Sequence, residues 1–114
     1  MLTNFNYKCC ITGITQPELI VASHILPWSK DKGNRLNPKN GLALNTLHDK
    51  AFDCGLITIT EDFKIKISSS FMKSKDVASI RHNFIDYDGM PLIEPQKFFP
   101  DVEFLKVHNG LFKP

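Results

Sequence analysis

The chain has 114 residues, of which 42% are hydrophobic and 23% are charged, and its formal net charge is +2. This length suits one domain with a single modest core, and the composition excludes a chain that is disordered throughout. The weak positive charge permits nucleic-acid binding without indicating it, because dedicated DNA-binding proteins often have a stronger basic stripe.

The cysteine pattern argues against a disulfide framework. Cys9 and Cys10 are adjacent, so a bridge between them would be strained, and Cys54 would leave one thiol over. We therefore expect reduced thiols and a cytoplasmic protein. We find no apolar run long enough to span a membrane and no basic-then-apolar leader, so we expect no membrane partner.

The first elements in chain order predict a strand followed by a loop. The apolar run 19–22 predicts a buried strand that ends at His24, because Pro27 stops regular structure shortly afterwards. The polar segment 29–39 contains glycine and proline and is expected to be an exposed loop.

A second strand and a helix are predicted next. The apolar segment 41–44 precedes Asn45, a typical helix N-cap residue, and a helix over 46–52 is expected to stop at Gly55. One helix face is expected to carry three apolar residues near one another, Leu44, Leu47 and Ala51, with His48 and Phe52 on the adjacent stripe.

The second half of the chain predicts a hairpin and further helices. Alternating residues in 56–60 and 63–67, around a turn at 61–62, indicate a β-hairpin with one wet face. Three weaker patterns follow: a helix over 76–87, a short edge segment over 90–93, and a helix over 101–109.

Three side chains in this framework suit attack on a phosphodiester. His24 ends the predicted strand, Asn40 ends the loop, and His48 lies on the predicted helix. One neutral imidazole can take a proton from water, and another can hold a divalent cation.

The order of these residues resembles the HNH endonuclease family. The resemblance rests on the pattern Cys-x-x-Thr-Gly … His-Ile-x-Pro-Trp … Asn-Gly-x-x-Leu … His-x-x-x-Phe-Asp-x-Gly-Leu-Ile, which covers the first half of the chain well and the second half poorly. It implies an α+β fold with a ββα-metal core (the His-Me finger), an added β-hairpin and C-terminal helices. We expect a single domain over 1–114, with the core at about 8–67 and a helical extension at about 74–114.

The resemblance also implies a role for each matching residue. His24 corresponds to the general base, Asn40 to a residue that braces the loop, and His48 to a metal ligand on the helix. Many relatives have Asp or His before the base as a second metal ligand, and this chain has Ser23, whose hydroxyl is a poor ligand for a hard cation. Water and substrate phosphate could complete the metal shell, and so could one of three side chains, in this order of preference: Asp53, Asn45 and Asp49.

Other parts of the family pattern are absent or open to a simpler interpretation. The paired Cys-x-x-Cys knuckles that hold a structural zinc in many relatives are missing. Asn40 could be only a turn residue before Gly41, and Asp53 could be only structural. The four basic residues of the loop either form a rim that contacts DNA phosphates or are simply solvated: Lys30, Lys32, Arg35 and Lys39.

The function implied is a metal-dependent DNA endonuclease, the cleavage domain of a restriction or defence nuclease. The cofactor expected is Mg²⁺ or Mn²⁺, with Zn²⁺ or Ni²⁺ as alternatives. Double-strand cleavage would call for a homodimer, and sequence recognition for a separate DNA-reading domain or subunit. The competing hypothesis is an HNH-like module that binds nucleic acid or protein without efficient cleavage.

Overall fold

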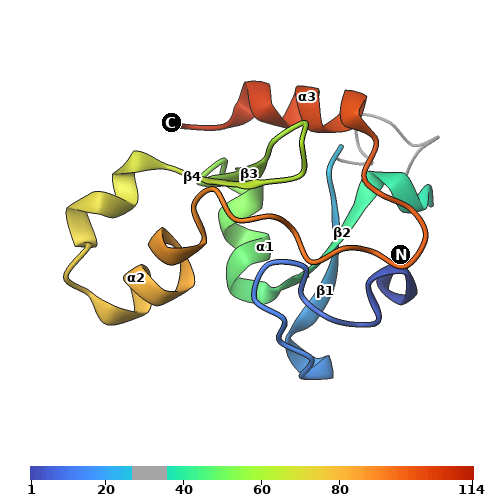
Figure 1. The fold of residues 1–114 in the computed structure, drawn as a ribbon, viewed down its shortest axis with the longest axis horizontal. Coiled ribbons are helices and arrows are strands. Elements are labelled where there is room, and N and C mark those ends of the chain that lie inside the picture. Colours follow the sequence, from blue (N-terminus) through green and yellow to red (C-terminus); the bar gives the residue numbers. More distant parts are fainter. Residues whose placement is uncertain (27–35) are drawn as a thin grey trace.

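The computed structural model describes residues 1–26 and 36–114, and Figure 1 shows their arrangement. The predicted basic-rim residues Lys30, Lys32 and Arg35 lie outside the described residues. In chain order the helices and strands are β1 (Ile20–His24), β2 (Gly41–Asn45), α1 (Thr46–Asp53), β3 (Ile57–Ile59), β4 (Ile65–Ile67), α2 (Ala78–Asn83) and α3 (Val102–Leu111). Short 3₁₀ turns are η1 (Leu2–Phe5), η2 (Pro17–Leu19), η4 (Pro38–Asn40), η5 (Ser69–Ser74) and η6 (Ile85–Tyr87).

The first hairpin sets the position of the candidate site. β1 and β2 are antiparallel, with Ile20 opposite Asn45 and His24 opposite Gly41. Leu42 and Leu44 of β2 are fully buried, and this burial stabilises the pairing. The side chain of Met1 lies 2.1 Å from where a Cβ of Gly41 would be, so any larger residue there would displace it.

Helix α1 follows β2 without a connecting loop and turns back along the hairpin. The Asn45 side chain accepts a hydrogen bond from His48 N at 3.0 Å, which confirms the predicted N-cap. Helix α1 packs against both strands, and its C-terminal end returns toward the end of the hairpin where β1 stops (Figure 1). After the helix, Gly55 has φ +75°, and a Cβ there would lie 2.5 Å from the carbonyl oxygen of Leu111, so glycine is required.

The predicted inward face of α1 is wrong in one respect. Leu47 is 50% exposed, whereas His48, Ala51 and Phe52 are buried. The reason is that Leu44 belongs to β2, so the helical spacing from Leu44 to Leu47 does not apply.

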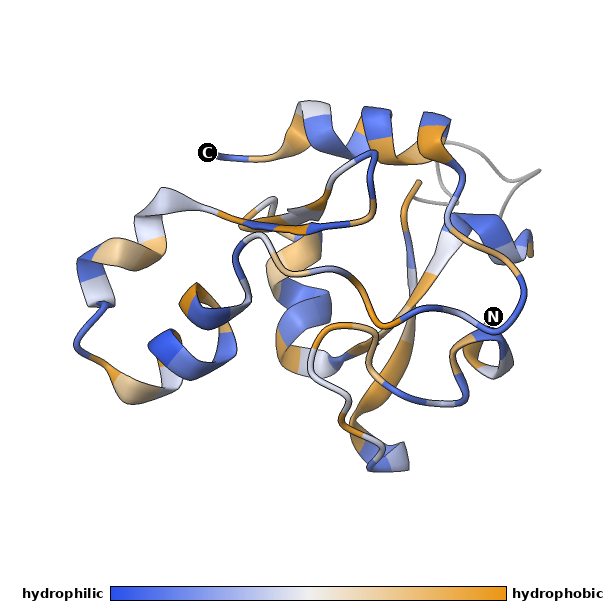
Figure 2. Cartoon of the chain, in the orientation of Figure 1, coloured by the Kyte–Doolittle hydropathy of each residue, from blue (hydrophilic) through white to orange (hydrophobic). Residues whose placement is uncertain are grey.

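The second hairpin is covered by α3. β3 and β4 pair antiparallel, with Ile57 opposite Ile67 and Ile59 opposite Ile65. The predicted edge segment runs along β4, where Met90 O accepts from Ile65 N at 2.8 Å. Helix α3 lies over this hairpin and buries Leu105 completely, and Figure 2 shows apolar residues concentrated on the strands between the helices.

The single helix predicted over 76–87 is divided into separate turns. Phe84 ends α2 with φ −127° and ψ −64°, and its buried ring stacks on Phe71 at 4.2 Å. Because this ring turns into the core, the helix is interrupted at Phe84, and η6 follows. The helix predicted over 101–109 is α3, whose N-cap is Asp101.

The architecture is therefore α+β, as predicted: a ββα core (β1, β2 and α1), an added hairpin and C-terminal helices. Cys9, Cys10 and Cys54 are free thiols in this structure. No helix in the described part of the chain is long and apolar enough to cross a membrane.

Candidate active site

His24 is the last residue of β1 and is half-buried. The backbone directly after it is held by the residue that precedes β2, because Ile25 N donates to Asn40 O at 3.0 Å. The imidazole therefore stands on backbone that is held in place at the end of β1, and a general base has to be held within hydrogen-bond reach of the proton that it takes.

Asn40 clamps the chain that leaves this strand. Its side chain is fully buried, Oδ1 accepts from Leu26 N at 2.8 Å, and Nδ2 donates to Leu26 O at 3.2 Å. Asn40 thus binds both backbone groups of the second residue after His24. These are the contacts that a bracing residue needs, and its effect on activity stays a prediction.

His48 is completely buried, and both of its ring nitrogens have partners. Nε2 lies 2.6 Å from the carbonyl oxygen of Asn83, which can only accept, so Nε2 carries the hydrogen. Nδ1 then keeps its lone pair and accepts from Nδ2 of Asn45 at 2.9 Å. Burial lowers the pKa of His48, which favours this neutral ring, although the bond to Asn83 opposes the shift.

In this geometry a neutral ring with these two hydrogen bonds has no free lone pair, so a cation could bind His48 only if one of the bonds were given up. The same consideration applies to the role predicted for Asn45. The Asn45 side chain is 4% exposed, and its oxygen caps α1 by accepting from His48 N. The sequence pattern placed His48 on α1 and Asn45 at its N-cap but could not indicate which way their side chains point.

The side chains of Asn45 and His48 belong to a buried polar cluster. Asn45 Nδ2 also lies 3.4 Å from Sγ of Cys9 and 3.2 Å from Oγ1 of Thr12. The spacing is Cys-x-x-Thr in one segment and Asn-x-x-His in the other, so the cluster joins the segment 9–12 to the start of α1. Through His48 and Asn83 it continues to α2, and its role is structural.

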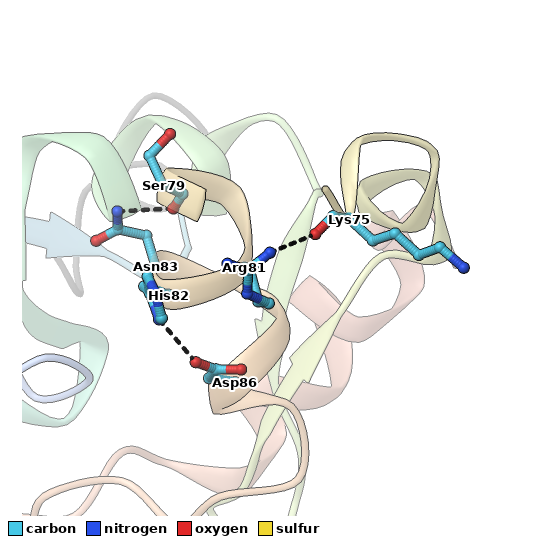
Figure 3. Close-up of polar contacts among 6 residues, drawn as sticks. All are labelled: Lys75, Ser79, Arg81, His82, Asn83 and Asp86. Atoms are coloured by element: carbon cyan, nitrogen blue, oxygen red, sulfur yellow. Dashed lines mark hydrogen bonds and ion pairs between the residues drawn. The ribbon is translucent and has the colours of Figure 1, made fainter. Parts of the chain in front are cut away.

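The other end of the bond from His48 lies on α2, which Figure 3 shows in close-up. The Asn83 side chain folds back to donate to Ser79 O at 2.8 Å, and His82 pairs with Asp86 at 3.2 Å. These local contacts hold the C-terminal turn of α2 in which the acceptor carbonyl lies.

Two carboxylates on α1 remain available to a cation. Asp49 and Asp53 are one helical turn apart, each directly following a buried residue, and Asp53 is exposed. The pKa of Asp53 is raised by partial desolvation and then by the negative charge of Asp49, so the two carboxylates sense each other. A cation between them would relieve this repulsion, and the sequence had ranked Asp49 last.

The donor set is small. Within residues 1–26 and 36–114 no group of three His, Cys, Asp or Glu side chains is arranged to hold a metal ion. Two carboxylates nevertheless suit Mg²⁺, which usually keeps several waters and takes further oxygens from substrate phosphate. The residues therefore fit a divalent cation that is held partly by the substrate.

Ser23 does not add to this set. Its side chain is 3% exposed, and its hydroxyl finds no hydrogen-bond partner among the described residues. Because side chains alternate along a strand, Ser23 lies on the opposite face of β1 from His24.

His108 is a second buried imidazole with a structural role. Its ring stacks on Phe52 at 3.6 Å, and its Nε2 lies 2.9 Å from Phe52 O. Nδ1 lies 2.7 Å from Oγ1 of Thr58, so α3 is tied to both α1 and β3. Burial lowers the pKa of His108 as well.

The fold and site thus define a ββα core of the kind expected for an HNH nuclease, and the comparisons agree with it. Residues 9–60 match the family described as HNH endonuclease, so the predicted resemblance to this family is confirmed over that segment. The match supports a nuclease at the level of the family.

Among solved structures the chain is similar to a "Modification dependent TagI restriction endonuclease", with a TM-score of 0.62 and 17% sequence identity. The similarity covers 97% of this chain and 35% of that one, and at this identity it establishes the fold alone. No curated protein matches the chain.

Proposed function

We propose that the chain is a metal-dependent DNA endonuclease domain in which His24 is the general base. The observation that carries the proposal is the end of β1, where His24 is followed by backbone that Asn40 binds at both polar groups. The match of residues 9–60 to the HNH endonuclease family supports the same assignment.

In this proposal His24 takes a proton from a water molecule as that water attacks the phosphorus in line. The bond from water oxygen to phosphorus forms, the bond to the 3′ oxygen breaks, and the products carry 5′-phosphate and 3′-hydroxyl ends. His24 suits this step because an imidazole can both accept and release a proton in the physiological pH range. Asn40 contributes by fixing the backbone that carries the base.

Asp49 and Asp53 are the residues that would hold the divalent cation, Mg²⁺ or Mn²⁺ by preference. When bound, the cation would neutralise charge on the phosphoryl oxygens and on the departing 3′ oxygen. Asp53 was among the ligands expected from the sequence, and Asp49 takes the place that His48 and Asn45 leave.

A second candidate function is a binding module that holds DNA without cutting it. It is favoured by the small donor set, since the described residues provide two carboxylates and no third ligand of the same kind. The biological setting that we propose is restriction or defence, with sequence recognition supplied by another domain or subunit and double-strand cuts made by a pair of such domains.

One gel separates the two functions. Purified protein is incubated with supercoiled plasmid and Mg²⁺ or Mn²⁺, with and without EDTA. The endonuclease proposal predicts nicked circles that appear only with metal. Plasmid that is retarded by the protein but stays supercoiled at every metal concentration would favour the binding module.

A further inference from the structure

A groove runs along the segment 97–101, between η4 and the N-terminal turn η1. One hollow of about 470 Å³ is lined by Lys39, Lys97, Phe98, Phe99, Pro100 and Asp101. A second hollow of about 200 Å³ adjoins it and shares Lys97 and Phe98. Figure 1 shows this part of the chain passing close to the N-terminus and to η4, and we call it the 97–101 groove.

The floor of the groove is held rigidly by a buried asparagine. Asn4 is 8% exposed, its Nδ2 donates to Phe98 O at 2.7 Å, and its Oδ1 accepts from Phe98 N at 2.9 Å. At the far end, Asp101 N donates to Lys39 O at 3.0 Å. The groove is therefore formed before any ligand binds, which lowers the entropy cost of binding.

The lining combines cations with an exposed aromatic ring. Lys39 and Lys97 are both exposed, and Phe99 is 40% exposed while its ring rests on Phe63 at 4.9 Å. The carboxylate of Asp101 is engaged as the α3 cap, where it accepts from Glu103 N at 2.8 Å. The exposed lysines and the Phe99 ring thus suit an anion with flat, apolar parts.

We propose that the 97–101 groove binds a single DNA strand, with Lys39 and Lys97 at the phosphates and an unpaired base stacked on Phe99. Bases within a duplex already have both faces covered, so a protein ring can stack only on a base that is unpaired. Lys39 directly precedes Asn40, which braces the backbone after His24, so one end of the groove adjoins the segment that supports the candidate active site. The inference rests on the proposed function for the identity of the nucleic acid and names where it lies.

The test measures binding without cleavage. A short fluorescent single strand and its duplex are titrated with the protein in EDTA, at several salt concentrations. Phe99→Leu keeps an apolar contact with Phe63 but removes the stacking ring, and should weaken single-strand binding on the order of tenfold. Lys97→Gln should weaken it too and lower the salt slope by about one phosphate contact.

Matched controls come from a similar lysine and ring elsewhere. Lys66 Nζ lies 5.4 Å from the Phe112 ring, as Lys97 Nζ lies 5.2 Å from Phe98, and neither Lys66 nor Phe112 lines the groove. Lys66→Gln and Phe112→Leu should bind the single strand as the parent does. Phe99→Trp retains a ring and should restore binding, which keeps the test decisive if Phe99→Leu lowers the melting temperature.

The outcome is distinct from that of the proposed function. A parent that nicks plasmid while Phe99→Leu and Lys97→Gln bind the single strand unchanged would overturn the groove and leave the endonuclease standing. A parent that never nicks but binds the single strand in a Phe99-dependent way would remove the endonuclease and support the groove. Tighter binding of duplex than of single strand, unaffected by Phe99, would also overturn the groove.

Discussion

The imidazole of His48 matches the family pattern, yet both of its ring nitrogens have partners within the fold. The pattern places it on α1, but its donor meets Asn83 O, and its lone pair meets Asn45. The neighbouring Asp49 and Asp53 carry the charge that a cation needs. The two interpretations predict different consequences of mutation.

His48→Ala should lower the free energy of unfolding by about 2–4 kcal/mol, because it leaves a cavity and an unpaired carbonyl in the core. Well below its melting temperature, the variant should need the same metal concentration for half-maximal nicking as the parent. Denaturant unfolding and a metal titration of the nicking rate measure the two effects.

Asp53→Asn should show the opposite pattern. Its side chain is exposed, so stability should change by less than about 1 kcal/mol, while the metal concentration for half-maximal nicking should rise. Asp76→Asn, another exposed carboxylate, provides the control and should leave nicking unchanged. If His48→Ala shifted the metal requirement and Asp53→Asn did not, the cation would have to be reassigned to His48.

At the scale of elements, the start of α1 carries more than an ordinary helix cap. Asn45 accepts from His48 N, and its amide also contacts Cys9 and Thr12. The N-cap of α3, Asp101, makes the usual bond to Glu103 N on a half-buried surface. The two caps therefore form a natural comparison.

Asn45→Ala should cost about 2–3 kcal/mol of unfolding free energy, since it removes a cap worth about 1 kcal/mol and leaves buried polar groups unpaired. Asp101→Ala should cost about 1 kcal/mol. Urea unfolding of both variants measures the difference. Equal losses would mean that the buried cluster adds nothing beyond capping.

The elements that the sequence predicts well are those whose partners lie nearby in the chain. β1, β2, α1 and the second hairpin follow from local apolar runs, Asn45 and the turn residues, and all lie close to their predicted bounds. The helix predicted over 76–87 does not match its predicted bounds, because Phe84 leaves α2 and stacks on Phe71.

The candidate site, too, is predictable from local sequence only in part. The positions of His24 and Asn40 follow from the pattern, whereas the direction of His48 depends on Asn83, thirty-five residues further along the chain. Local periodicity contains no information about that contact.

For the whole molecule, two buried imidazoles predict how stability depends on pH. Burial lowers the pKa of both His48 and His108 below the ordinary value of about 6.5, so the unfolded chain binds more protons than the folded one just below that pH. The stability that the two neutral rings contribute should therefore be complete above about pH 7. The free energy of unfolding should decrease as the pH falls toward about 5.5.

Denaturant unfolding at a series of pH values measures this slope. His108→Gln should reduce it, and His82→Gln, which alters an exposed ring beside Asp86, should not. A stability that stays level or rises as the pH falls over this range would contradict the neutral, buried assignment of the two rings.

The chain corresponds to 35% of the length of the restriction endonuclease whose fold it shares. DNA recognition, dimerisation and the biological setting are therefore proposals that concern the whole protein. What the described residues carry themselves is the ββα core, and the most direct question is whether His24 acts there as a base.

That question is answered by the nicking rate of the parent and of His24→Ala on supercoiled plasmid with Mg²⁺ or Mn²⁺, at protein concentrations that give equal DNA occupancy. We expect His24→Ala to fold and bind DNA like the parent but to nick at least about a hundredfold more slowly, the usual effect of removing a general base. Nicking by His24→Ala at the parental rate would contradict this expectation.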